Sequence, residues 1–145
     1  DGTIDCIATD HAPHTIEEKK LPYGQAPSGM PGVETSLTLM LNEVSKGIVK
    51  IEDIVKWMSE NPATLYKLKN KGFLKIGYDA DITIVDMNKQ KVISNKNVKS
   101  KCGWTAFNGT KTTGWPITTI VNGNIVYDNE ELNFDFSGKR VEFED

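Results

Sequence analysis

The first apolar positions of the chain alternate as they do in a β-strand. Ile4, Cys6 and Ala8 fall on one face of this segment, and Ile7 and Thr9 fall on the other. The run is short and largely apolar on both faces, which is typical of a covered strand. We therefore predict a buried strand that ends at Thr9.

Helical spacing of apolar residues replaces this alternation further along the chain. An amphipathic helix is predicted over residues 33–46, and a second over residues 51–60. Asn61 and Pro62 fit an N-cap followed by proline at the first helical position, so they predict a third, short helix through Leu68. Core packing accounts for the apolar faces of these helices, and we assign them no chemistry.

The spacing changes again at Gly72, from helical to strand-like. Short strands are predicted at 73–76 and 81–85 with a turn between them, and the polar residues 89–113 predict a loop with short strands. Helices that end before residue 70 and strands that begin after it predict two units. The boundaries are 1–70 for the first unit and 71–145 for the second, which is all-β.

A β-hairpin is predicted near the end of the second unit. Two strand-like segments, 117–121 and 124–127, flank Asn122-Gly123. This dipeptide between alternating apolar residues is the strongest short-range hairpin signal. The tail beyond residue 129 contains one candidate edge strand.

Proline and glycine dominate the segment that precedes the first predicted helix. Between Pro22 and Gly32 they occupy six of eleven positions, which excludes regular structure and favours one particular path. A flexible linker is the alternative, but such linkers favour glycine and serine. We predict an ordered binding loop, preceded by a turn of helix in the charged residues 16–20.

Composition limits the class of protein. The chain has 145 residues, of which 38% are hydrophobic and 26% charged, as in a soluble globular protein. No apolar run approaches the roughly 18 residues of a spanning helix, and the net charge of −3 suggests no nucleic-acid surface. Two cysteines make no disulfide framework, so we expect buried thiols in a cytoplasmic protein.

Ligand-type side chains follow the first predicted strand at once. Asp10, His11 and His14 come directly after it, and Pro13 prevents a helix from forming through them. A (β/α) barrel presents its active site at such strand ends. Asp10 suits a divalent-metal ligand and general base, although an aspartate after a strand also commonly caps a turn. Three residues so close together do not complete a tetrahedral zinc site, so further ligands would have to come from elsewhere.

Five segments together resemble the C-terminal portion of bacterial-type dihydroorotases, which belong to the metal-dependent amidohydrolase superfamily. The segments are ATDHAPH, EEK, QAPSGMPGVET, ENPA and GFLKIGYDADITIVD. Hydantoinases and allantoinases share the Asp-His pair but usually lack the full D-H-A-P-H. The resemblance implies an α/β plus β fold, with the last strand and helices of a distorted TIM (β/α)8 barrel followed by a small β-sandwich.

The resemblance also implies an activity and the residues that serve it. The family interconverts (S)-dihydroorotate and N-carbamoyl-L-aspartate in pyrimidine biosynthesis, with one or two Zn²⁺ ions in the full-length active site. Asp10 matches the family's metal ligand, which also acts as general base and acid. His14 matches a histidine that contacts the substrate carboxylate, and backbone groups of Ser28 and Gly29 match the loop pair that closes on the substrate. His11 is expected to orient Asp10 or the loop.

Three hypotheses for the whole protein stay open. The first is a dihydroorotase of which this chain is an inactive fragment, because the family's His-x-His pair and bridging lysine are absent from it. The second is another cyclic amidohydrolase, such as a hydantoinase or allantoinase. The third is a non-catalytic, dihydroorotase-like scaffold for aspartate transcarbamoylase. An unpaired barrel strand also predicts either a homodimer or disorder over residues 1–30, and no nucleic acid or membrane partner is expected.

Overall fold

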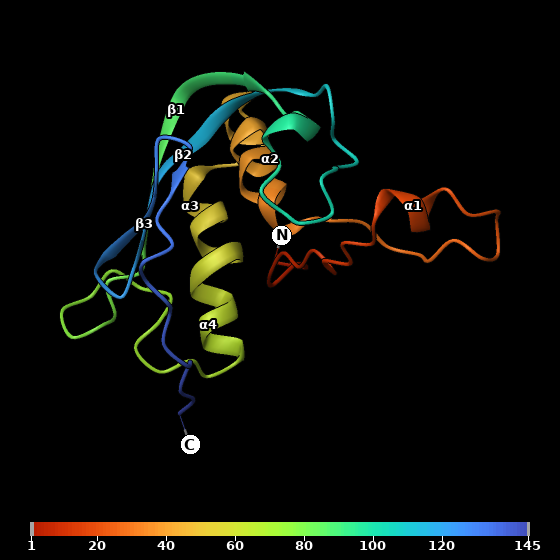
Figure 1. The fold of residues 1–145 in the computed structure, drawn as a ribbon. Helices are drawn as coiled ribbons and strands as arrows, with labels where there is room; N and C mark the ends of the chain where they lie inside the picture. Colours follow the sequence, from red (N-terminus) through yellow and green to blue (C-terminus); the bar gives the residue numbers. More distant parts are fainter. Residues whose placement is uncertain (1, 145) are drawn as a thin grey trace.

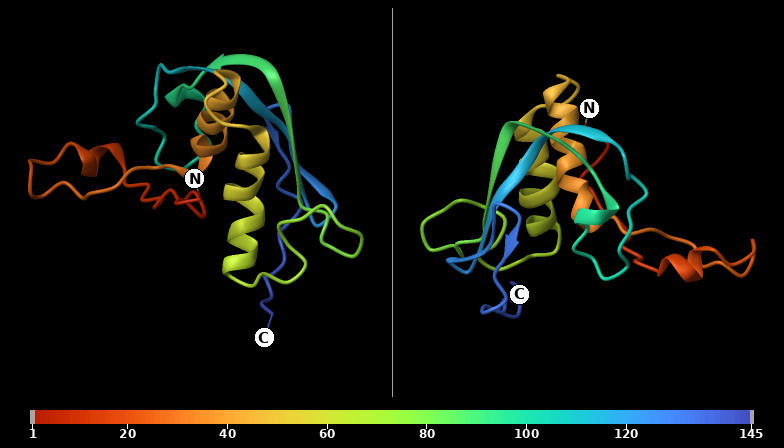
Figure 2. Two further views of the ribbon diagram at one scale, coloured as in Figure 1. Left: turned by 180° about the vertical axis from the view of Figure 1, so that it is seen from behind. Right: turned by 45° about the horizontal axis from the view of Figure 1, so that its top comes forward.

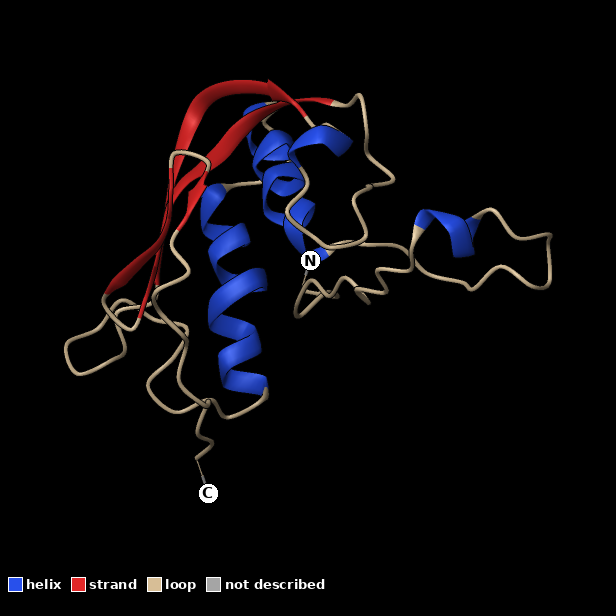
Figure 3. Cartoon of the chain, viewed as in Figure 1, coloured by secondary structure: helices blue, strands red, loops and turns tan. Residues whose placement is uncertain are grey.

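A curved antiparallel sheet lies against helices, and an arm extends from this body (Figures 1 and 3). The computed structural model describes residues 2–144. The four strands occur in the order β1-β2-β3-β4 in one sheet. The helical elements are α1 (Ile16–Lys19), α2 (Val33–Ser45), α3 (Ile51–Val55), a π-helical turn (Lys56–Glu60), α4 (Asn61–Leu65) and a 3-10 turn (Asn95–Asn97), and the strands are β1 (Ile82–Val92), β2 (Lys111–Val121), β3 (Asn124–Asp128) and β4 (Glu131–Leu132).

Strands β2 and β3 form the hairpin that the sequence predicts. Asn122 and Gly123 have φ angles of 47° and 81°, and a two-residue hairpin turn requires positive φ at both of its central positions. Val121 is paired with Asn124 across the turn. Strand β4 adds two residues at the edge of the sheet beyond β3, which confirms the edge strand expected in the tail.

A charged cluster holds this turn to the start of β1. One carboxylate oxygen of Asp81 accepts a hydrogen bond from the Asn122 N–H at 2.7 Å, and the other pairs with Lys71. Lys71 also lies 2.8 Å from Asp79. Burial raises the pKa of Asp81, but the Asn122 N–H and Lys71 together outweigh burial and lower it. Asp81 therefore stabilises the fold above the ordinary aspartate pKa of about 4, and the contribution is lost as pH falls through the lowered value.

Helix α2 packs directly on β2 at a glycine, and it confirms the helix predicted over 33–46. A Cβ atom added to Gly114 would lie 2.7 Å from the Cβ of Leu41, and Gly114 has a φ of 95°. Leu41 is only 1% exposed. The small core also contains the buried side chains of Ile54, Ala63 and Ile93, so this helix–sheet contact is central to it.

The strand predicted at the start of the chain does not form among residues 2–144. Residues 2–10 join no sheet, and His11 forms only an isolated parallel bridge with Met30. Strand structure depends on hydrogen bonds to neighbouring strands, and the one sheet among residues 2–144 does not include this segment. Its amide contact is with a helix instead, because the Ile7 N–H donates to the carbonyl of Trp57 at 3.1 Å.

The predicted helix break at Asn61 is also wrong. Helix α3, the π-helical turn and α4 form one continuous helix (Figure 1). The Asn61 N–H donates to the carbonyl of Lys56, five residues back. Pro62 has no N–H to give to Trp57, so this wider turn leaves the Trp57 carbonyl without a donor inside the helix. The N–H of Ile7 fills that position.

The strands of the second half differ from prediction in length and place. Residues 73–76 form no strand, and Lys75 lies 4.5 Å from the centre of the Phe73 ring. Strand β1 continues to Val92 and β2 begins at Lys111, so polar residues assigned to a loop belong to a long ladder. Pairing between neighbouring strands overrides local propensity here.

Large apolar side chains are unusually exposed on this chain. Leu74 is 82% exposed, Phe134 85%, and Tyr23 and Ile76 are fully exposed. Apolar surface of this extent is normally covered by further protein. Between residues 2 and 144 no helix has both the length and the apolar character to cross a membrane.

Candidate active site

Asp10 lies at the end of the extended N-terminal segment, in an unusual backbone conformation. Its φ is 43°, and aspartate is among the few residues other than glycine that adopt this region readily. The residue is exposed. Its carboxylate makes no hydrogen bond or ion pair with any other residue of the described range 2–144. An unengaged carboxylate at this position suits a ligand for a divalent cation.

His11 fastens the start of helix α2. Its Nδ1 accepts hydrogen bonds from the N–H groups of Gly32 at 3.1 Å and Val33 at 3.3 Å. Gly32 is the N-cap of α2 and has no side chain to fill that role. The His11 ring therefore satisfies amides that open the helix. This agrees with the expectation that His11 orients the loop, and its Nδ1 is not free to bind a metal.

His14 lies at the base of the arm, which comprises residues 13–30 (Figure 2). Its side chain is 38% exposed, and Nδ1 is 3.6 Å from a carboxylate oxygen of Glu18. Thr15 and Glu18 form a capping box at the start of α1, which confirms the predicted turn of helix. Hydrogen bonds from the Thr15 N–H and hydroxyl lower the pKa of Glu18, and His14 contributes. Glu18 thus keeps a negative charge beside the imidazole.

The arm has two limbs, one that leads out from the body and one that returns to it, and hydrogen bonds join them near the base. The ammonium of Lys19 donates to the carbonyls of Pro27 at 2.7 Å and Gly29 at 2.9 Å. The Ala12 N–H donates to Met30 at 3.0 Å, and a Cβ atom on Gly29 would lie 2.5 Å from that of Ala12. The arm is thus ordered as predicted for the proline- and glycine-rich segment.

Ser28 and Gly29 lie exposed on the limb that returns to the body. The contacts at Ala12 bring Gly29 alongside the residues that follow Asp10. The carbonyl of Gly29 accepts from Lys19, and the donors that this pair can offer to a ligand are its N–H groups and the Ser28 hydroxyl. His14 lies on the outgoing limb and Asp10 just before the arm, each two residues from Ala12, which contacts Gly29 and Met30.

The metal chemistry of this site needs residues beyond those described. Residues 2–144 contain no group of three or more His, Cys, Asp or Glu side chains that could hold a metal ion. Asp10 fits one ligand by its exposure and free carboxylate. Structural and catalytic zinc sites use three or four protein ligands, and within residues 2–144 Asp10 stands as a single candidate ligand rather than as part of such a group.

Two residues that the sequence analysis assigned no role, Trp104 and Glu34, contact this region. The indole Nε1–H of Trp104 donates to the carbonyl of His14 at 2.7 Å. The carboxylate of Glu34, in the first turn of α2, accepts from the N–H groups of Lys99 at 2.8 Å and Ser100 at 3.0 Å. For Trp104, the available sequence signal was a large aromatic side chain in an otherwise polar segment.

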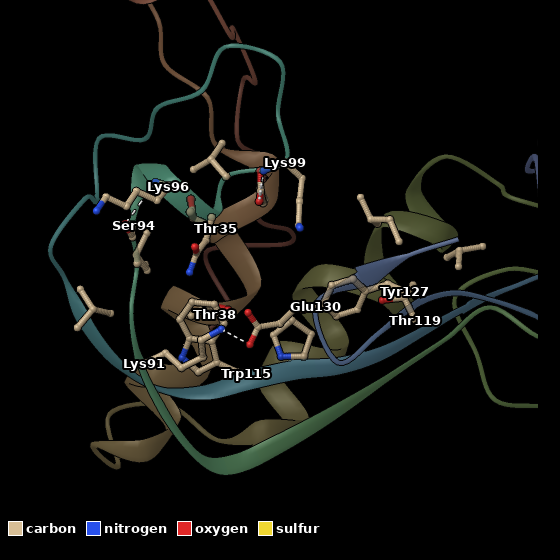
Figure 4. A pocket seen from close by; sticks show the side chains of 18 residues that line it. Thr35, Thr38, Lys91, Ser94, Lys96, Lys99, Trp115, Thr119, Tyr127 and Glu130 are labelled. Carbon is tan, nitrogen blue, oxygen red and sulfur yellow. Dashed lines mark hydrogen bonds and ion pairs between the residues drawn. The ribbon is translucent and has the colours of Figure 1, made fainter. Parts of the chain in front are cut away.

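A cavity of about 480 Å³ lies between α2 and the sheet (Figure 4). Thr38 and Trp115 both line it, and Lys91 lies 2.6 Å from Glu130 and 5.0 Å from the centre of the Trp115 ring (Figure 4). None of the four candidate site residues lines it. The candidate site is therefore a surface at the base of the arm rather than part of this cavity.

Comparison with known proteins identifies the family. The amidohydrolase family matches residues 1–126, which is most of the chain. The chain belongs to the amidohydrolase family. This amidohydrolase chain is similar to curated dihydroorotases, as the five sequence segments predict. They include the proteins of Pyrococcus horikoshii (42% identity over 139 residues, 96% of this chain and 32% of the relative), Endomicrobium trichonymphae (47% over 128 residues, 88% and 30%) and Bacillus cereus (46% over 131 residues, 90% and 30%).

Several solved structures with a similar fold carry the name hydantoinase. The L-hydantoinase of Arthrobacter aurescens superposes with a TM-score of 0.86 at 34% identity, over 91% of this chain and 30% of that chain. The D-hydantoinase of a Thermus species superposes with a TM-score of 0.85 at 28% identity, again over 91% and 30%. The amidohydrolase chain thus spans about a third of the length of the proteins it matches.

Proposed function

We propose that the protein containing this chain is a dihydroorotase that interconverts (S)-dihydroorotate and N-carbamoyl-L-aspartate. The observation that carries the proposal is the identity of 41–47% to curated dihydroorotases, over 88–96% of the chain. A match over 139 of the 145 residues necessarily spans positions 10–14, which include Asp10 and His14. Similarity at that level across a candidate active-site segment favours a shared reaction.

Asp10 is the residue to which we assign the proton transfers. Ring opening requires a proton to leave the attacking water and a proton to reach the departing amide nitrogen. A single exposed carboxylate can do both in turn as general base and then general acid. A bound divalent metal, which we propose to be zinc, would supply Lewis-acid polarisation and favour ionisation of water at neutral pH. The free carboxylate of Asp10 fits one ligand of such a site.

His14, Ser28 and Gly29 are assigned to substrate binding. Dihydroorotate carries a carboxylate, which an imidazole N–H can contact as a hydrogen-bond donor, and His14 Nδ1 lies 3.6 Å from a carboxylate oxygen of Glu18. The backbone N–H groups at Ser28 and Gly29 would add neutral donors on the other limb of the arm. Hydrogen-bond donors from both limbs suit a ring that carries a carboxylate better than one that lacks it.

The remaining ligands are proposed to lie outside residues 2–144, in the part of the relatives that this chain does not match. In that arrangement residues 1–70 contribute the last strand and helices of a distorted barrel, and residues 71–145 contribute to a β-sandwich. The extended segment before Asp10 supports this, since it is apolar but lacks strand partners here. The exposed apolar side chains support contact with a second copy or with an aspartate transcarbamoylase. The two free cysteines support a cytoplasmic location.

A hydantoinase is the second candidate, and the solved structures of similar fold favour it. The test is turnover of dihydroorotate, hydantoin and allantoin by the full-length protein, followed by chromatography of the ring-opened products. We expect the highest kcat/KM with dihydroorotate. Turnover of hydantoin or allantoin but not of dihydroorotate would overturn the proposal, and no turnover of any ring by metal-loaded protein would favour the scaffold hypothesis.

A further inference from the structure

A segment of the second half of the chain braces the candidate site from outside. We call residues 98–104 the brace. At one end, Lys99 and Ser100 donate their N–H groups to the carboxylate of Glu34. At the other end, Trp104 donates its indole N–H to the carbonyl of His14 at 2.7 Å. The brace therefore touches both the start of helix α2 and the base of the arm.

These contacts close a ring around the base of the arm. His11 accepts from the amides of Gly32 and Val33, and Glu34 follows them in the chain. Glu34 is hydrogen-bonded to the brace, which contains Trp104, and Trp104 is hydrogen-bonded to His14. The chain then connects His14 back to His11, three positions earlier. A closed ring restricts His14 more than one contact would, because no member can move without another hydrogen bond breaking.

The brace is itself held in place. The N–H of Thr105 donates to the Asn95 side chain at 2.9 Å, and the N–H of Asn95 donates to the Asn108 side chain at 2.9 Å. Thr105 is only 5% exposed. Trp104 thus extends from a fixed loop, which a positioning contact requires.

We propose that Trp104 is a positioning residue that fixes the backbone of His14 for binding of the substrate carboxylate. The inference rests on the proposed function, because it assigns His14 to that carboxylate. Trp104 touches no reacting atom in this scheme and acts only through His14. Since the carboxylate is remote from the reacting amide, looser positioning of His14 weakens binding in the ground and transition states alike. The result is a higher KM with kcat unchanged.

The test compares two tryptophan variants of the full-length protein. Trp104→Phe keeps a large ring but removes the N–H that reaches His14. Trp115→Phe is the matched control, because its Nε1 is buried without a hydrogen-bond partner in residues 2–144. We expect Trp104→Phe to raise KM for dihydroorotate about two- to tenfold, the range for one neutral hydrogen bond, with kcat within twofold. Trp115→Phe should leave both constants within twofold of wild type.

A double-variant cycle tests whether the effect passes through His14. In a His14→Ala background, Trp104→Phe should no longer change KM. An undiminished KM effect there, or unchanged KM in Trp104→Phe alone, would overturn the inference. If Trp104→Phe fails to fold, Glu34→Gln loosens the other end of the ring and should raise KM in the same direction; an unchanged KM would overturn the inference equally.

Hydrogen exchange separates this inference from the proposed function. The His14 N–H donates to the Ala12 carbonyl at 2.9 Å, so its exchange reports local opening at the arm base. Trp104→Phe should accelerate it at least about twofold and Trp115→Phe should not. Absence of that acceleration overturns the positioning role even in an active dihydroorotase. Faster exchange in a protein that leaves dihydroorotate intact would overturn the proposed function alone.

Discussion

Replacing Asn61 with alanine is expected to loosen the segment that leads to Asp10. The side-chain amide of Asn61 donates to the carbonyl of Asp5 at 2.6 Å, across 56 positions in the sequence. Two residues further along the same segment, the Ile7 N–H donates to the Trp57 carbonyl. These two hydrogen bonds dock the extended segment on the long helix.

The magnitude follows from the loss of one hydrogen bond at a partly exposed position. Such a bond contributes about 0.5–1.5 kcal/mol net, and water can reach the exposed Asp5 carbonyl after the change. Local opening at Ile7 should become about two- to tenfold more frequent, since about 1.4 kcal/mol corresponds to a factor of ten. The melting temperature should fall by about 1–5 °C for a chain of this size.

Amide hydrogen exchange at Ile7 is the assay, with Asn61→Asp as a near-isosteric variant that also lacks the donor. Thr64→Ala is the control, because the Thr64 hydroxyl donates to the Glu60 carbonyl within the same helix and not to the extended segment among residues 2–144. We expect faster exchange at Ile7 in both Asn61 variants and not in the control. Equal exchange rates in Asn61→Ala and Thr64→Ala would refute the docking role.

Three further predictions concern other parts of the fold. Gly114→Ala should destabilise the protein by about 1–3 kcal/mol more than Gly109→Ala in denaturant melts, because both glycines have positive φ but only the first would clash with α2; equal losses would contradict the packing. As pH falls from about 5 to below the lowered pKa of Asp81, the wild type should lose more stability than Asp81→Asn, because the unfolded chain takes up the proton first; parallel losses would exclude that contribution. Lys19→Met should speed limited proteolysis of the arm several-fold relative to Lys20→Met, because the Lys19 ammonium donates to the carbonyls of Pro27 and Gly29 on the returning limb; equal cleavage rates would contradict this stabilising role.

Local sequence patterns correctly predicted the elements whose stabilising contacts lie mostly within one short segment. The helix over 33–46 formed because its capping and apolar face lie within one segment, and Asn122-Gly123 formed its turn for the same reason. The N-terminal strand failed because a strand needs neighbours that residues 2–144 do not provide. The break at Asn61 failed because a π-helical turn accommodates Pro62 while a distant amide satisfies the freed carbonyl. Neither outcome can be read from spacing alone.

The residues of the candidate site also divide into those that could be inferred from the sequence and those that could not. Its residue types could be inferred from sequence, because Asp10 and His14 follow an apolar run and match a family segment. Trp104 and Glu34 could not, since their contacts join positions 90 and 65 residues apart. Hydrogen bonds across such separations depend on the path of the chain between them, and only the folded arrangement reveals them.

The assignment of Asp10 to the proton transfers can be tested by the ring opening of dihydroorotate by the full-length protein and its Asp10→Asn variant. Asparagine keeps the size of the side chain but removes the negative charge and the base. We predict turnover by the wild type and a loss of about a hundredfold or more in kcat in the variant. Wild-type protein that leaves dihydroorotate intact, or a variant as active as wild type, would contradict the account.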